Sequence, residues 1–382
     1  MHEQISSFLQ ERIDASDFPS AVYLVAEKGE IVFQDALGDA VVEPERIEAK
    51  LDTIYDLASL TKPLVTGLLC AKLIESNDIN IDEQADLSDF LFELDARDSQ
   101  TIRIDELLTH TSGLPAWRPF YLLLKEKWDL LLQILGTDLE TKPRQVIYSD
   151  LNFLLLSFVL ERHFGKPLDA IALDVIFQPL RLKDTCFKPA RKLRERTAAS
   201  ELGNEYEKRT CIEQGYLQPP ATAGGSDKIR NPQSAFRTHQ IWGEVHDGNA
   251  YFMGGVAGHA GLFSTAEEVF KIAQQFLPNY TTLLKPETCE LFCTNFTKGM
   301  NEDRSFAFQL ASTKDSTAGT KMSPESFGHN GFTGTSLWID PVKERIFVLL
   351  TNRTHNHPLP FVNINSVRRK FHDLAIEALD AR

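Results

Sequence analysis

The chain has 382 residues, of which 42% are apolar, and its formal net charge is −14. This length and apolar content are enough for a sizeable core, in one large domain or in two interleaved ones. The negative charge argues against nucleic acid or an anionic membrane as the main partner, because both would require basic patches. The densest basic stretch, residues 191–196, is short and is interpreted as a solvated face.

The first ten residues carry Glu3 and lack a basic segment followed by a long apolar one, so they do not resemble a secretory signal. No run approaches about 18 uninterrupted apolar residues, which predicts that the chain has no ordinary membrane span. The cysteines are odd in number and scattered, which indicates buried thiols in a reducing compartment. They are Cys70, Cys186, Cys211, Cys289 and Cys293, of which the last two, four residues apart, could touch. We therefore expect a cytoplasmic protein, or a periplasmic one if a leader has been removed.

In chain order, apolar residues at helical spacing first predict a helix over 2–15. Two β-prone runs, 21–26 and 31–36, then flank a polar turn and predict a hairpin. A long middle, about 60 to 250, is predicted to be mainly helical, with helices over 122–135 and 153–164.

The end of the chain returns to strands. Runs 335–339 and 345–350 predict a second hairpin, and a helix follows over 362–380. We therefore expect an α+β fold, in which an antiparallel sheet is built from both chain ends and flanked by helices. The predicted division is a sheet domain of 1–58 and 255–382 and a mainly helical inserted domain of 59–254. A functional site is expected in the cleft between them.

Ser59-Leu60-Thr61-Lys62 opens an apolar run with leucines at helical spacing. Residues three apart share one face of a helix, so the Lys62 amine can reach the Ser59 hydroxyl and accept its proton during attack. Unpaired amides in the first turn also favour developing negative charge. The same pattern fits a helix cap with a solvated lysine, so the assignment depends on partners elsewhere.

Two further motifs offer such partners. In Tyr148-Ser149-Asp150-Leu151-Asn152, a phenol whose pKa is lowered by an ammonium can act as a general base or return a proton to a leaving group. A carboxylate at Asp150 could hold Lys62 in place. In Gly328-His329-Asn330-Gly331-Phe332-Thr333-Gly334-Thr335, glycines allow close approach of a ligand, and an edge strand offers amides to a carbonyl. Singly, these motifs also fit a capped loop and a flexible turn.

In this order and spacing, the three motifs resemble the serine penicillin-recognising superfamily of class C β-lactamases, D-alanyl-D-alanine peptidases and β-lactamase-like esterases. Segments 107–115, Leu-Leu-Thr-His-Thr-Ser-Gly-Leu-Pro, and 254–266 are also typical of it, so the resemblance covers nearly the whole chain. It implies a β-lactamase/transpeptidase-like fold and acyl-serine chemistry without a cofactor. The residues of the second and third motifs are most similar to those of a subgroup that contains cell-wall-recycling amidases. These amidases cleave between N-acetylmuramic acid and the first peptide residue.

The resemblance also implies roles for single residues. Ser59 matches the acylated nucleophile, Lys62 its proton acceptor, and Tyr148 the base or proton shuttle. The oxyanion hole would combine the Ser59 amide with an amide near the following strand, for which we choose Thr333. The expected oxyanion and substrate-binding residues are Asp150, His259, His329, Asn330, Gly331 and Thr333.

Two positions depart from the superfamily pattern. Asp150 stands where asparagine is usual, and its charge should keep Lys62 more readily protonated. His329 stands where lactamases usually have the lysine of Lys-Thr-Gly, and a histidine whose charge depends on pH captures a substrate carboxylate less firmly. Both departures disfavour efficient β-lactam turnover and favour ester or muramyl-amide hydrolysis.

Two groups of histidines could have roles of their own. His246, Asp247 and His259 could line the cleft or hold a metal, since imidazole and carboxylate suit zinc. They lack a tight ligand spacing and serine chemistry needs no metal, so we predict no metal site. The segment 355–357, His-Asn-His, follows a strand and is interpreted as an exposed turn.

We therefore predict a serine hydrolase that cleaves an ester or amide through an acyl-serine intermediate, with a small ester, amide or muramyl peptide as substrate. One alternative is an N-acetylmuramyl-L-alanine amidase or D-alanyl peptidase acting on peptidoglycan fragments, and another is a true β-lactamase. A non-catalytic ligand-binding relative is disfavoured because the serine, lysine and tyrosine are all present. The sequence leaves the oligomeric state open.

Overall fold

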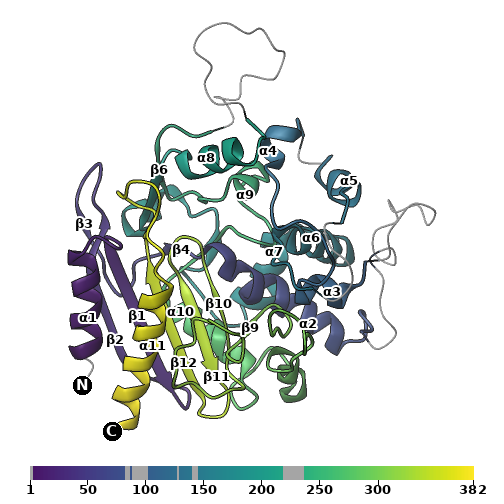
Figure 1. Cartoon of the computed structure of the whole chain (residues 1–382). Coiled ribbons are helices and arrows are strands. Elements are labelled where there is room, and N and C mark those ends of the chain that lie inside the picture. The colour runs from purple at the N-terminus through teal and green to yellow at the C-terminus, as the bar shows by residue number, and fades with distance from the viewer. Residues whose placement is uncertain (1–2, 82–86, 88–101, 127–128, 140–144, 218–235) are drawn as a thin grey trace, which may run out of the picture.

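A computed structural model describes residues 3–81, 87, 102–126, 129–139, 145–217 and 236–382. Its centre is a seven-stranded antiparallel sheet with the strand order β3-β2-β1-β12-β11-β10-β9 (Figure 1). The strands are β1 Ser20–Glu27, β2 Glu30–Val41, β3 Ile47–Glu48, β9 Gln309–Leu310, β10 Phe327–Asn330, β11 Ser336–Asp340 and β12 Arg345–Thr351. Both chain ends supply this sheet, which confirms the predicted α+β class.

The two predicted hairpins are confirmed and meet at the centre of the sheet. β1 pairs with β12 from Ala21 opposite Thr351 to Glu27 opposite Arg345. The first turn contains Lys28 and Gly29, both with positive φ, which is the geometry that a tight two-residue hairpin turn requires.

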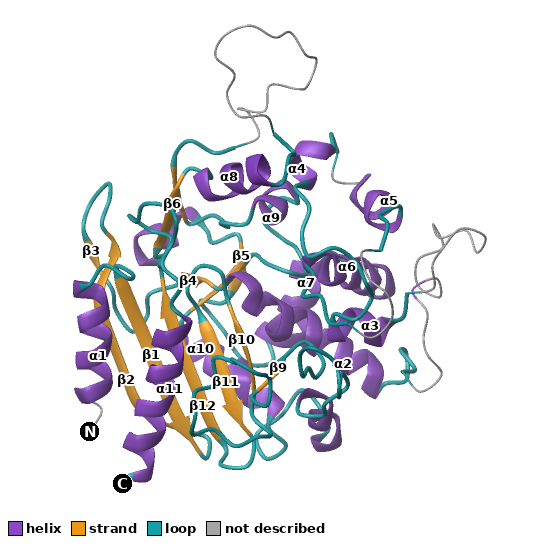
Figure 2. Cartoon of the chain, viewed as in Figure 1, coloured by secondary structure: helices purple, strands orange, loops and turns teal. Residues whose placement is uncertain are grey.

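The two faces of the sheet are covered by different helices, because successive side chains of a strand point to opposite sides. On one face, Tyr23 and Val25 of β1 pack under α1 Glu3–Asp14 and α11 Asn365–Asp380 (Figure 2). On the other face, Val22 and Leu24 belong to the main core, together with α10 Ala266–Ala273. The predicted terminal helices therefore both cover the sheet.

The chain between the two halves of the sheet is mainly helical, as predicted. Its α-helices are α2 Leu68–Glu75, α3 Ile104–Thr109, α4 Phe120–Leu123, α5 Leu130–Leu135, α6 Asp150–Phe164, α7 Leu168–Ala172, α8 Glu205–Glu213 and α9 Gly248–Phe252. Among the described residues, the 3₁₀ and π segments include η1 Ala58–Leu60, η2 Lys62–Gly67, η5 Leu173–Phe177, η6 Arg191–Arg196, η8 Gln274–Phe276 and η9 Pro286–Phe292. α6 is buried along most of its length and carries the second motif at its first turn.

Short strands that the sequence did not predict tie this helical part together. β6 Ala199–Leu202 pairs with β7 Gln240–Trp242, and β8 Leu262–Ser264 lies between β4 Tyr55–Asp56 and β5 Cys186–Phe187. One continuous buried cluster includes residues of the sheet and of the helices. The domain boundaries at 58/59 and 254/255 stay a prediction.

The single helix predicted over 122–135 is wrong. α4 ends before Leu124, whose backbone is extended, and α5 begins only at Leu130. Leu124 is buried while Lys125 and Glu126 are exposed, so the charged pair interrupts the apolar face. Residues 127 and 128 lie outside the described residues.

The exposed turn predicted over 355–357 is wrong for its first residue. His355 is fully buried; its Nδ1 donates to the Ser200 carbonyl at 2.9 Å, and its Nε2 accepts the Val42 amide at 2.8 Å. It therefore connects the end of β2 with β6.

The five cysteines are free thiols, three of them buried and two partly buried. Among the described residues, none of the helices has the length and apolar character needed to cross a membrane.

The close pairing of β10 with β11 gives a stability prediction. A Cβ on Gly328 would lie 2.2 Å from the ring of the fully buried Trp338 and 2.6 Å from the Leu337 carbonyl oxygen. We expect Gly328→Ala to lower the free energy of unfolding by about 3 kcal/mol, because the core there must shift. Gly165→Ala, where no atom lies within 4 Å but φ is +63°, should cost about 1 kcal/mol. Urea unfolding of both variants checks this, and equal losses would contradict it.

Candidate active site

A cavity of about 560 Å³ lies where the three motifs meet. It is bordered by Ser59 of η1, by Tyr148 and Asp150 at the start of α6, and by residues 329–331 at the end of β10. The structure thus brings together the first, second and third motifs, which are far apart in the sequence.

Ser59 is not on the first turn of a regular α-helix, as the sequence suggested. It lies in the 3₁₀ helix η1, which continues into the π-helical turn η2 with Pro63 near its start. The residue before it, Ala58, has a φ of +48°, a conformation that costs energy for a residue with a side chain. The backbone at the nucleophile is therefore held in an uncommon shape.

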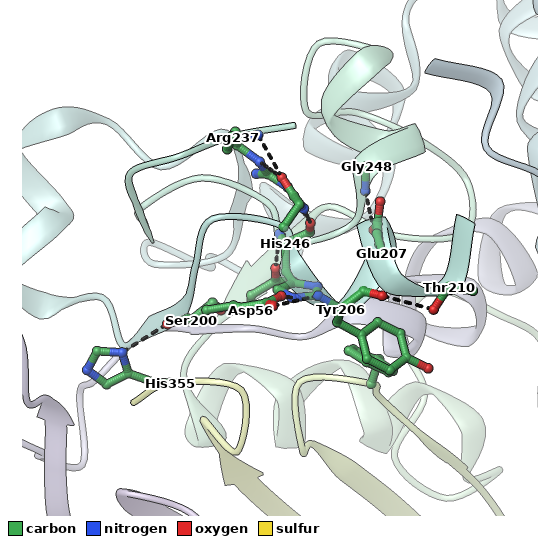
Figure 3. A network of polar contacts seen from close by, with 12 residues as sticks. Asp56, Ser200, Tyr206, Glu207, Thr210, Arg237, His246, Gly248 and His355 are labelled. Atoms are coloured by element: carbon green, nitrogen blue, oxygen red, sulfur yellow. Dashed lines mark hydrogen bonds and ion pairs between the residues drawn. The ribbon is translucent and has the colours of Figure 1, made fainter. Parts of the chain in front are cut away.

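Asp56 fixes this backbone, and no sequence motif pointed to it. Its two carboxylate oxygens accept the amide protons of Ala58 at 2.9 Å and of His246 at 2.8 Å, and Figure 3 shows the second contact. Burial raises the pKa of Asp56, although these two amides oppose the shift. The carboxylate connects β4 with the loop before α9.

Lys62 is fully buried and has three acceptors around its ammonium. Nζ lies 2.7 Å from Asp150 Oδ1, 3.0 Å from Ser59 Oγ and 3.1 Å from the His259 carbonyl oxygen. The contacts with Ser59 and His259 are hydrogen bonds, and the contact with Asp150 is an ion pair that balances the charge of the ammonium. Asp150 therefore holds Lys62 against the serine hydroxyl.

The electrostatics keep Lys62 charged in the resting protein. Burial alone would lower the pKa of Lys62, but the charge of Asp150, together with the nearby Tyr148, outweighs it, and the pKa of Lys62 is raised. This agrees with the expectation that an aspartate at position 150 favours the protonated lysine. For Lys62 to accept the serine proton, the site must first lose a proton.

Tyr148 is the second group that can lose this proton. The Lys62 ammonium lies 4.9 Å from the centre of its ring. Its hydroxyl is buried and makes no hydrogen bond of ordinary geometry with the described residues. Burial raises the pKa of Tyr148, while the nearby Lys62 opposes this. The resting pair is therefore a phenol beside an ammonium.

His329 is a buried residue that borders the cavity. Its Nδ1 donates to the Asn330 carbonyl at 2.9 Å, and the ring is buried. Burial and the charges of Lys62 and Arg304 hold the pKa of His329 well below its usual value. His329 therefore loses its charge at a lower pH than an ordinary histidine, in keeping with the expectation that it captures a substrate carboxylate weakly.

The remaining predicted residues take different places. Asn330 and Gly331 border the cavity. Thr333 does not, because it is buried with its hydroxyl donating to the Asp56 carbonyl at 2.7 Å; Phe332 borders the cavity instead. His259 is buried behind Lys62 and contributes its carbonyl rather than its ring.

The His246, Asp247 and His259 cluster separates in the structure. His246 pairs with Glu201 at 2.9 Å, whereas His259 Nε2 contacts Asp247 at 2.9 Å. Donor atoms of Asp150, Asp247 and His259 do lie within 4.8 Å of one another. The ammonium of Lys62 contacts Asp150 there and would repel a metal ion, so we assign no metal to this group.

Several residues around the cavity were missed because they belong to no motif. They include Trp117, Arg304, and Tyr206 and Glu207 of α8. In Figure 3, Tyr206, Glu207 and Thr210 come from α8, and the Glu207 carboxylate accepts the Gly248 amide at 2.7 Å. Burial and the charge of Asp247 raise the pKa of Glu207 to about 7.

The family follows from comparison with known proteins. A family model described as Beta-lactamase matches residues 5–368. The chain belongs to this β-lactamase family. A "Putative D-alanyl-D-alanine carboxypeptidase" of Escherichia coli (strain K12) is 31% identical over 381 residues, which cover 92% of this chain and 82% of that protein. A relative with the same description from Salmonella gallinarum is 33% identical over 390 residues, with 92% and 83% covered.

Solved structures show the same fold. The hydrolase EstCE1, described as having promiscuous acyltransferase activity, is 21% identical with a TM-score of 0.69, and 97% of each chain is covered. A class C β-lactamase from Rhodobacter sphaeroides is 16% identical with a TM-score of 0.67, with 98% of this chain and 99% of that chain covered. This β-lactamase-family protein is an enzyme of the serine hydrolase type.

The contact between Lys62 and Asp150 gives a pH prediction for this enzyme. Asp150 raises the pKa of Lys62, and its charge acts on Tyr148 in the same direction. Without that charge, either base becomes available at lower pH. We expect Asp150→Asn to move the acidic limb of kcat/KM for a neutral ester to lower pH by about one unit or more.

A matched control is Asp169→Asn, which removes the carboxylate of an exposed pair with Lys188 and should leave the limb in place. If the acidic limb of kcat/KM stays at the same pH or moves to higher pH in Asp150→Asn, the proposed role of Asp150 is contradicted.

Proposed function

We propose that Ser59, Lys62 and Tyr148 are the catalytic residues of this enzyme, and that they cleave an ester or amide through an acyl-serine intermediate. The observation that supports this most strongly is the buried Lys62 amine, 3.0 Å from the Ser59 hydroxyl, in a cavity that Tyr148 also borders. A lysine and a phenol beside a serine are the bases that its activation needs.

The reaction begins once the Lys62–Tyr148 pair has lost one proton. Ser59 Oγ then bonds to the substrate carbonyl carbon while its proton passes to this pair. The proton is returned to the leaving nitrogen or oxygen as the old bond breaks. Water attacks the acyl-serine by the same path in reverse and releases the acid.

The oxyanion of the tetrahedral intermediate needs two amide donors. We assign one to Ser59 and, in place of Thr333, the other to Phe332. Phe332 borders the cavity next to Gly331, whereas Thr333 is buried and faces Asp56.

The nucleophile can be tested by covalent labelling. A fluorophosphonate or fluorescent penicillin probe should add one adduct to the protein, because the activated hydroxyl attacks phosphorus or a strained amide. Intact mass and peptide mapping should place the adduct on Ser59. Ser59→Ala should remove it, while Ser76→Ala, a change further along the same helical run, should not. An unchanged adduct on Ser59→Ala would overturn the assignment.

The substrate is proposed as a small ester or amide, with two more specific candidates. The curated relatives are described as D-alanyl-D-alanine carboxypeptidases, which favours hydrolysis of a D-alanyl peptide. The residues of the second and third motifs resemble those of cell-wall-recycling amidases, which favours a muramyl-peptide amide. The aspartate at position 150 and the neutral His329 make a β-lactam the weaker candidate.

A four-substrate comparison separates these candidates. We expect p-nitrophenyl butyrate to be hydrolysed and nitrocefin to be at least about tenfold poorer in kcat/KM, because His329 supplies no charge for the lactam carboxylate. A D-alanyl-D-alanine peptide and a muramyl dipeptide complete the set. Turnover of the ester alone would remove both peptidoglycan candidates, and nitrocefin as the best substrate would contradict the expected order. The cytoplasmic location stays a prediction.

A further inference from the structure

The ring of Tyr148 lies between two cations. Lys62 Nζ is 4.9 Å from the ring centre, and the guanidinium carbon of Arg304 is 5.2 Å from it. Arg304 belongs to none of the motifs, since it lies in the loop before β9. Its residue is 4% exposed, and it borders the same cavity as Ser59.

Arg304 is only partly neutralised by its own contacts. Its Nη2 pairs with Glu302 at 2.8 Å, and the Glu302 side chain keeps 18% of its surface exposed. The Nε and Nη1 atoms of Arg304 are buried and have no hydrogen-bond partner among the described residues. Two donors of a permanent cation are therefore left without an acceptor at the catalytic tyrosine.

The other rings around Tyr148 supply no charge. His110 lies 4.6 Å from the Tyr148 ring and His329 5.6 Å, measured between ring centres. Burial, followed by the charges of Arg304 and Lys62, holds the pKa of both histidines well below its usual value. Among the described residues, the titratable and charged groups that face Tyr148 are Lys62, His110, Asp150, Arg304 and His329.

We propose that Arg304 is a positioning residue for catalysis: it sets the proton affinity of Tyr148 and so favours the pair of Lys62 ammonium and Tyr148 phenolate in the active form. After the Lys62–Tyr148 pair has lost one proton, the remaining exchangeable proton is either on Lys62 Nζ, which leaves a phenolate, or on the phenol oxygen, which leaves a neutral amine. The negative charge of Asp150, 2.7 Å from Nζ, keeps it on the lysine, and the positive charge of Arg304 beside the ring stabilises the phenolate.

This role rests on the proposed function of Tyr148 as the proton shuttle. The phenolate oxygen accepts the proton of Ser59 as the bond from Oγ to carbon forms. The same O–H then breaks, and the proton passes to the leaving group. No other reactant is needed. Arg304 thereby supplies, from outside the motifs, the permanent cation that is missing at position 329.

The test is the pH dependence of kcat/KM for a neutral ester, so that binding of a substrate carboxylate cannot contribute. In Arg304→Gln the acidic limb should move up by about one pH unit, which corresponds to about a tenfold loss on that limb, while the alkaline plateau changes less. Arg304→Lys should recover most of the shift. Arg196→Gln is the matched control, because Arg196 pairs with Asp52 and Asp184 and does not border the cavity; it should not move the limb.

A second measurement does not depend on turnover. The phenolate absorbance of Tyr148 is titrated in the Ser59→Ala protein and corrected with Tyr148→Phe. Adding Arg304→Gln should raise the Tyr148 pKa, and adding Arg304→Lys should not. If Tyr148 titrates with the same pKa with and without the Arg304→Gln change, the proposal is overturned. It is also overturned if Arg304→Gln lowers kcat/KM only for substrates that carry a carboxylate. If the probe fails to label Ser59, the proposed nucleophile is wrong. The titration of Tyr148 still tests the effect of Arg304, because it does not depend on turnover.

Discussion

The fully buried ammonium of Lys62 is the constraint on which the site depends. A charge without solvent must be paired and hydrogen-bonded, and removing one partner of such a pair costs about 3–5 kcal/mol. The three acceptors come from η1, from the start of α6 and from the segment before β8. Satisfying one cation therefore brings three distant parts of the chain to the same point, and that point is the nucleophile.

The same burial decides which other groups carry charge. His110 accepts the Ser149 amide at 2.9 Å through Nδ1, and His329 donates to the Asn330 carbonyl through its own Nδ1. Both rings are used as neutral hydrogen-bonding groups, and burial keeps them so. The electrostatic field at Tyr148 then depends on the charges of Lys62, Asp150 and Arg304. A site of this kind responds to pH mainly through the Lys62–Tyr148 pair itself.

Much of the fold could be predicted because its signals are local. The hairpins alternate with period two, and the three motifs have short internal spacings, so Ser59, Lys62 and Tyr148 could be named from the sequence. Asp56 and Arg304 could not, because each acts through a partner distant in sequence. The same reason explains the error at His355, which contacts β2 and β6. The prediction of a single helix over 122–135 was wrong for another reason. The leucines there have helical spacing, but Lys125 and Glu126 interrupt the apolar face.

The outer helix of the sheet is coupled to the site through a buried arginine, and a second, partly buried arginine follows β12. Arg368 of α11 donates to the Gly331 and Thr335 carbonyls at 2.8 and 2.9 Å, and Arg353 donates to the Phe332 carbonyl at 2.7 Å. Burial lowers the pKa of Arg368 to about 9, which still leaves it charged at neutral pH. Because these carbonyls are engaged by cations, the groups that the turn can offer to a substrate oxygen are its amides. The packing of α11 on the sheet therefore helps to determine the polarity of the turn that faces Ser59.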